Sequence, residues 1–164
     1  MHDHEEVHGL WIRACGDLDV VDVRGLETLQ ALIGGPIEGC QVWDHAGEQA
    51  IMTVYWHEEG QLIKGMQINH AITHFLHYGG VLQGDQVIVG DCVVVGPLDD
   101  EGNDTCVSEW VVEMMQEGVK QVNALVQSAY DREFSKIVRR LDKSDTVRNV
   151  KTRKKKGKKK KNDN

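Results

Sequence analysis

The sequence predicts an α+β fold, with a mixed or antiparallel sheet packed against two or three helices, a long C-terminal helix and a disordered basic tail. Short apolar runs bounded by glycine turns alternate with segments of helical periodicity, in the order strands, helix, strands, helix, strands, long helix. The length of 164 residues fits one domain. We therefore expect a flexible N-terminus over residues 1–9, a single domain over 10–141 and a disordered basic tail over 142–164.

The N-terminal part predicts two short strands and a helix. Leu10 to Ala14 and Asp19 to Val23 have the composition of strands, and Cys15-Gly16-Asp17 forms the turn between them. Apolar residues then recur at helical spacing from Leu26 to Ile33. A helix is expected to stop at the glycine pair that follows, Gly34-Gly35.

The middle of the chain predicts further strands and a second helix. Residues 36–43 and 51–56 are expected to be strands, and the latter has two largely apolar faces, which favours an interior place in the sheet. A helix is expected over 69–78. Residues 84–89 and 90–95 are similar to each other in sequence, and this near-repeat predicts either two buried strands or one strand bent at Gly90. An acidic loop is expected next, at 97–104.

The C-terminal pattern from Ser108 to about Leu141 is helical, with one apolar stripe. A helix of that length spans about 50 Å, which is long for so small a domain. We therefore expect either a break near Gly118 or shortly after Tyr130, or a partner that covers the exposed end of the stripe.

The net charge of −7 hides a strong asymmetry between the two ends of the chain. From Arg139 onward there are 13 Lys or Arg and 3 Asp or Glu, whereas the preceding 138 residues contain 6 Lys or Arg and 23 Asp or Glu. The body should therefore repel nucleic acid and acidic membranes, and only the tail should attract them. The dense lysines repel one another, which predicts disorder in the tail.

The sequence also bears on the compartment. No run of about 18 apolar residues occurs, and the N-terminus lacks the pattern of a signal peptide. We expect a cytoplasmic protein, in the host cell if it comes from a phage, with reduced thiols. The four cysteines are Cys15, Cys40, Cys92 and Cys106, and none of them forms a C-x-x-C pair. Cys92 is expected in the core.

Three blocks give the chain a family resemblance. They are Ile33 to Glu38; His57 to Leu62, followed by Gly65 and Asn69; and Gly84 to Gly90, running on to Gly96. In this order and spacing the chain resembles the domain of unknown function family 3846, found in bacteriophages and some bacteria. The resemblance covers roughly Leu26 to Pro97. It implies a phage or mobile-element setting and a compact α/β domain, and it implies no reaction.

Two histidine patterns are candidate metal sites. His4 to His8 matches H-E-x-x-H, which binds zinc only on a helix, but it lies at the N-terminus ahead of a strand. His70, His74 and His77 have the spacing of one helical face, and three histidines can hold a catalytic zinc. No acidic residue in that helix is available to orient the imidazoles. We therefore expect an exposed polar face, no metal and no cofactor.

Two further features suggest nucleic-acid contact. Tryptophan rings can stack on bases, but little basic charge lies near the four tryptophans in the sequence, and core roles are favoured for them; they are Trp11, Trp43, Trp56 and Trp110. The lysine tail can neutralise phosphates, act as a solubilising extension or dock a partner. Its candidate residues for nucleic-acid binding are Lys154, Lys155, Lys156, Lys158, Lys159, Lys160 and Lys161.

Taken together, these features favour a non-enzymatic, phage-type accessory protein that binds a host or phage protein through its acidic body. An acidic body can also mimic the charge of nucleic acid and block a basic site. The alternatives are a nucleic-acid-associated protein that uses its basic tail, and a small metal-dependent enzyme built on His70, His74 and His77. No membrane partner is expected, and the sequence does not indicate an oligomeric state.

Overall fold

The computed structural model describes residues 6–159, with side chains as far as Ser144. The chain divides into two compact units, residues 1–124 and 125–164, and the last helix runs through both. In chain order the elements are β1 (Val7–Ile12), β2 (Leu18–Val23), α1 (Gly25–Ile33), β3 (Ile37–Trp43), β4 (Ala50–His57), the 3₁₀ helix η1 (Gly60–Leu62), α2 (His70–Tyr78), β5 (Cys92–Val95) and α3 (Glu109–Lys159).

The five strands form one sheet in the order β2-β1-β5-β4-β3, and every neighbouring pair is antiparallel. This confirms the predicted α+β class and decides the sheet type in favour of the antiparallel alternative. Strand β4 lies between β5 and β3, as its two apolar faces predicted. The central strand is β5, whose four residues are all buried.

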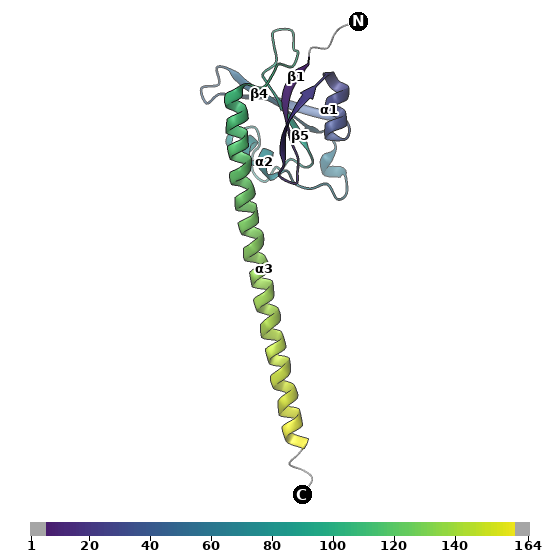
Figure 1. Cartoon of the computed structure of the whole chain (residues 1–164), viewed down its shortest axis with the longest axis vertical. Coiled ribbons are helices and arrows are strands. Elements are labelled where there is room, and N and C mark those ends of the chain that lie inside the picture. Colours follow the sequence, from purple (N-terminus) through teal and green to yellow (C-terminus); the bar gives the residue numbers. More distant parts are fainter. Residues whose placement is uncertain (1–5, 160–164) are drawn as a thin grey trace. The chain divides into compact units, whose positions relative to one another are not determined.

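Helices cover both faces of the sheet in the first unit (Figure 1). On one face, Val93 and Val95 of β5 pack with Leu29 and Ile33 of α1. Successive residues of a strand point to opposite faces, so Cys92 and Val94 face the other side. There, α2 and the first turns of α3 bury the other half of the core, which includes Leu10, Ile12, Ile72, Leu76, Val111 and Met115.

A buried asparagine joins α2 to the sheet. Asn69 is 1% exposed, and its side-chain oxygen accepts a hydrogen bond from the Ile72 N–H, which caps the helix. Its Nδ2 donates to the carbonyl oxygens of Ile12, at 2.9 Å, and Gly90, at 3.1 Å. One side chain therefore fixes the start of α2 against both β1 and the approach to β5.

Residues 84–89 do not form the strand that the near-repeat predicted. Only Cys92–Val95 is a strand, and the earlier run contributes a single isolated bridge between Val89 and Ile68. Gly90 has φ +82, and this bend turns the chain between the two runs. Ile88 is buried without joining the sheet, because its N–H donates to the Thr73 hydroxyl and its carbonyl accepts from the Asn69 N–H.

Helix α3 is continuous, so the predicted breaks near Gly118 and after Tyr130 are wrong. Gly118 serves a close contact instead, because a Cβ at this position would collide with the ring of Phe75 in α2. Farther along, Asn123 donates a hydrogen bond to the carbonyl of Gly16 at 2.8 Å. The buried side of this segment is formed by Val111, Met115, Val119 and Val122.

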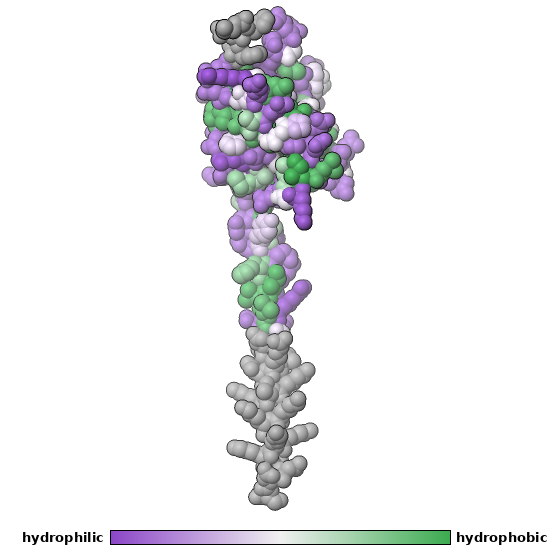
Figure 2. Space-filling model, turned by 90° about the vertical axis from the view of Figure 1, so that its right-hand side faces the viewer, coloured by the Kyte–Doolittle hydropathy of each residue, from purple (hydrophilic) through white to green (hydrophobic). Residues whose placement is uncertain are grey.

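The second unit begins within α3 at Leu125. Figure 2 shows hydrophobic surface, in green, on the last part of the helix that is coloured. The large apolar or aromatic side chains of this segment include Tyr130, Phe134, Ile137 and Leu141, each more than half exposed. The backbone of α3 is helical as far as Lys159, and the side chains beyond Ser144 and residues 160–164 lie outside the described part. The disordered tail expected over 142–164 therefore stays a prediction.

Other features of the first unit bear on the expectations. Strand β1 begins at Val7, so residues 7–9 belong to the sheet, and residues 1–5 lie outside the described part. All four cysteines are free. Cys92 is fully buried as expected, and burial raises the pKa of its thiol. Among the described residues, no helix has the length and apolar character needed to cross a membrane.

Candidate functional site

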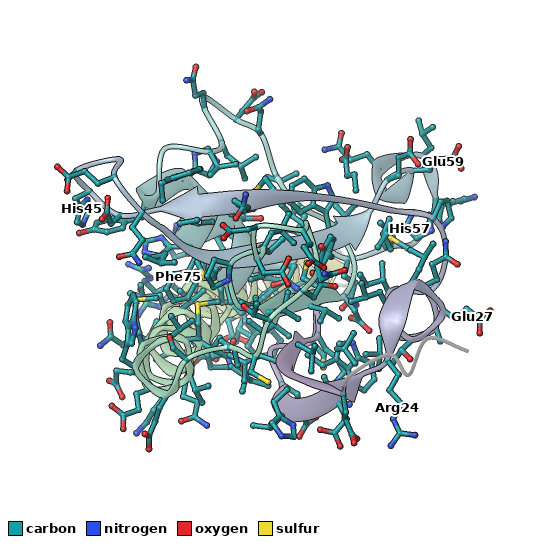
Figure 3. All side chains as sticks on the ribbon, turned by 90° about the horizontal axis from the view of Figure 1, so that it is seen from above. Arg24, Glu27, His45, His57, Glu59 and Phe75 are labelled. Carbon is teal, nitrogen blue, oxygen red and sulfur yellow. The ribbon has the colours of Figure 1, made fainter. Side chains whose placement is uncertain are left out.

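The first unit contains a pocket of about 660 Å³ at the end of strand β4. One wall comes from the β3–β4 pair and η1, and the other from the loop that precedes β5. Figure 3 labels His57 and Glu59, which lie at this end of the sheet. The lining residues are Glu38, Trp56, His57, Glu58, Glu59, Gln61, Leu62, Leu82 and the run from Asp85 to Val89.

A cross-strand pair builds the first wall. Glu38 of β3 lies opposite Trp56 of β4, and the Trp56 indole N–H donates to the Glu38 carboxylate at 2.5 Å. Residues opposite each other on antiparallel strands present their side chains on the same face. The hydrogen bond therefore fixes an aromatic ring and a negative charge side by side at the rim of the pocket.

His57 anchors the turn that follows β4. It is 5% exposed, and its Nδ1 accepts a hydrogen bond from the Glu59 N–H at 3.1 Å. The neutral ring must then carry its proton on Nε2. That nitrogen faces Gly35, where any Cβ would collide with it, and the Glu58 N–H donates to the Pro36 carbonyl at 2.9 Å. The end of α1 and the end of β4 are thereby held together.

Hydrogen bonds from α2 and η1 hold the opposite wall, the loop from Leu82 to Val89. The Gln61 side-chain amide donates to the Val87 carbonyl at 2.9 Å, and His77 Nε2 donates to the Gln86 carbonyl at 2.7 Å. The Gln83 N–H donates to the side-chain oxygen of Gln86. These bonds, together with that between Ile88 and Thr73, fix the backbone of a segment whose β pairing is limited to the isolated bridge between Val89 and Ile68.

The pocket combines negative charge with apolar surface. Four of its lining residues are acidic, namely Glu38, Glu58, Glu59 and Asp85, and none of the described residues that line it is Lys or Arg. Trp56 and the side chains of Leu62, Leu82 and Val89 supply the apolar part. Such a lining suits a cation that also carries an aliphatic stem or lies on an aromatic ring, as Lys and Arg side chains do.

The three candidate metal-binding histidines lie on α2, as predicted. His70 and His74 are exposed, whereas His77 is half-buried and held by Gln86, so its predicted exposure is wrong. The sequence could not reveal this contact, because it depends on how the loop folds back over the helix. Within the described residues, no group of three or more His, Cys, Asp or Glu side chains is placed to hold a metal ion. That these histidines bind no metal stays a prediction.

The other candidate residues are scattered. His8 lies in strand β1 and contacts Asp22 at 2.6 Å, whereas H-E-x-x-H needs a helix, and His4 and Glu5 lie outside the described residues. Trp43 and Trp110 are half exposed, so the core role expected for them is wrong. The side chains of the candidate lysines, Lys154 to Lys161, also lie outside the described part.

The fold and the pocket define a small α+β domain with an antiparallel sheet between helices and an acidic pocket at one end of that sheet. The chain belongs to the family described as Domain of unknown function (DUF3846), whose model matches residues 8–120. The match is longer than the sequence suggested, and it includes the first turns of α3. Neither curated proteins nor solved structures gave a significant match.

The pocket residues were not singled out from the sequence as a site, although a signal for them was present. The three blocks that carry the family resemblance include Glu38, the run from His57 to Leu62, and the run from Asp85 to Val89. In the structure the three blocks meet around one cavity, which no property of a single block indicates.

Proposed function

We propose that this protein is a non-enzymatic accessory factor, of the phage type that the family resemblance implies, and that it binds a basic segment of a host or phage protein in the acidic pocket. The observation that carries this proposal is the lining of the pocket, which combines four carboxylates with an aromatic ring, whereas no lysine or arginine is present among the described lining residues. The negative charge of the body as a whole would draw a basic partner toward this surface.

The chemistry of the pocket favours recognition over catalysis. The buried imidazole of His57 already accepts a hydrogen bond from the Glu59 backbone, and the indole N–H of Trp56 is already bonded to Glu38. These groups thus have structural partners. The carboxylates of Glu58, Glu59 and Asp85 line the cavity, where they can accept hydrogen bonds from a guanidinium or an ammonium group.

The indole N–H of Trp56 offers a site-specific test. The probe is a short peptide of alternating arginine and leucine, titrated into the ¹⁵N-labelled full chain and followed by NMR. The Trp56 indole signal, assigned by its loss in Trp56→Phe, should shift and saturate. The indole signals of Trp11, Trp43 and Trp110 serve as internal references, because none of these residues lines the pocket.

Charge variants complete the test. Combining Glu58→Gln, Glu59→Gln and Asp85→Asn should weaken the peptide at least about tenfold, since charged hydrogen bonds contribute about 1.5–3 kcal/mol each when desolvated. The matched control removes three exposed carboxylates outside the pocket, with Glu48→Gln, Asp100→Asn and Glu101→Gln, and should leave binding nearly unchanged. Equal weakening by both sets, or equal shifts of all four indoles, would reduce the effect to non-specific attraction and overturn the proposal.

A further inference from the structure

The second unit presents an apolar seam with the spacing of a coiled coil. The seam consists of Tyr130, Phe134, Ile137 and Leu141, which are 67%, 67%, 52% and 59% exposed. Their intervals of four, three and four residues match the d and a positions of a heptad repeat. At about 100° per residue, the four side chains lie within about 60° of one another around the helix axis.

Such a seam is costly for an isolated helix to expose. Large apolar side chains in a continuous exposed row mark an interaction surface. A single helix without tertiary contacts is also only marginally stable in water, because helical stability comes mainly from packing of its apolar face. A partner that covers the seam would therefore stabilise both this face and the helix that carries it.

The charges beside the seam are self-complementary in one orientation only. Glu133 and Arg140 lie at g positions on the same flank, whereas Asp131 and Val138 lie at e positions on the other. Two antiparallel copies bring g positions together, so Glu133 of each copy meets Arg140 of the other. Two parallel copies place g against e, which leaves Glu133 opposite Val138.

The C-terminal charges favour the same orientation. After residue 144 each chain has ten Lys or Arg and two Asp or Glu. A parallel pair would place both basic ends at the same end of the helix pair, where they repel each other, whereas an antiparallel pair separates them.

From the heptad spacing and these charges, we infer that the seam binds a second copy of this chain, as an antiparallel helix pair with Tyr130 facing Leu141 and Phe134 facing Ile137. The ion pair that Glu133 makes with Lys136 within one chain, at 2.8 Å, does not prevent this. Exposed ion pairs contribute little, so Glu133 can turn to Arg140 of the other copy.

Sedimentation of the full chain over a wide range of concentration tests the inference. The protein should pass from monomer to dimer, and Ile137→Gln should raise the dissociation constant at least about tenfold, because a polar group enters the seam. The matched control is Leu125→Gln. Leu125 is as exposed as Phe134, at 67%, but lies about 150° from the seam, so its replacement should change little.

A charge-exchange experiment tests the orientation. Glu133→Lys and Arg140→Glu should each weaken self-association, because each creates two like-charge contacts in the pair. An equal mixture of the two variants should dimerise again, since every contact between them is then attractive. The near-ultraviolet circular dichroism of the body should stay unchanged throughout, which excludes misfolding as the cause.

Three results would overturn the inference. They are a monomer at every concentration, an association that Ile137→Gln weakens no more than Leu125→Gln does, and two charge variants that fail to recover when mixed. The last would dismiss the antiparallel pair even if some association remains. The pocket proposal uses other residues and another probe, so it stands or falls separately.

Discussion

Replacing Asn69 by alanine should destabilise the first unit more than any other single loss of a polar side chain that we can identify from its contacts. The side chain is 1% exposed and makes three hydrogen bonds to the backbone, one to the N–H of Ile72 and two to the carbonyls of Ile12 and Gly90. Loss of a helix cap costs about 1 kcal/mol. Each of the other two bonds adds about 1 kcal/mol, so we expect a loss of about 3 kcal/mol.

The variants Asn69→Ser and Asn69→Ala separate the cap from the two bonds to carbonyls. Serine keeps an oxygen that can accept from Ile72 but cannot reach both carbonyls, so it should lose about 2 kcal/mol. Urea unfolding of the full chain, monitored by near-ultraviolet circular dichroism, measures the differences. For a unit of this size, a loss of about 3 kcal/mol lowers the melting temperature by about 10 °C.

Asn103→Ala is the control, because its hydrogen bonds to Asp99 lie within an exposed loop. It should cost less than about 0.5 kcal/mol, as most exposed substitutions do. A loss below about 1 kcal/mol for Asn69→Ala, or a serine variant as stable as the unchanged chain, would refute the idea that Asn69 joins α2 to the sheet.

Two further predictions concern the contact between Gly35 and His57 and the basic C-terminal tail. Gly35→Ala should destabilise the first unit by about 1–3 kcal/mol in urea unfolding, because the new Cβ collides with His57. Adding His57→Ala to this variant should recover part of the lost stability. If it recovers none, the collision is not the cause. Truncation after Asp145 should leave the urea midpoint of the first unit unchanged and abolish salt-sensitive binding to DNA and RNA oligonucleotides, because the body is acidic. A truncated chain that still binds them would refute the charge argument.

The elements that the sequence predicted well have strong local signals. Gly34 ends α1 in the left-handed conformation, with φ 94, and Asn69 caps α2, so both helix boundaries follow from single residues. The strands expected over 36–43 and 51–56 match β3 and β4 within one residue at each end. Such signals act over a few residues and do not depend on the rest of the fold.

The parts that were missed depend on contacts between distant segments. The run of Val87, Ile88 and Val89 has the composition of a strand, yet its backbone bonds go to α2 and η1 and not to the sheet. Glycine often marks a break in a helix, yet Gly118 lies within continuous helix, where the ring of Phe75 occupies the space that a Cβ would fill. The pocket unites residue 38 with 56–62 and the loop 82–89. The contacts of that loop with α2 and η1 form the second wall, and they have no local signature.

The family match separates the two proposals along the chain. Residues 8–120 include every residue that lines the pocket, whereas the seam of Tyr130, Phe134, Ile137 and Leu141 lies wholly beyond them. The same division follows from packing, because the buried side of α3 ends with Val122 and the row of exposed apolar residues begins after it. A basic partner in the pocket and a second copy on the seam therefore use different surfaces. If the seams pair as we infer, one assembly carries two pockets, and a partner with two basic segments should bind the dimer more tightly than the monomer.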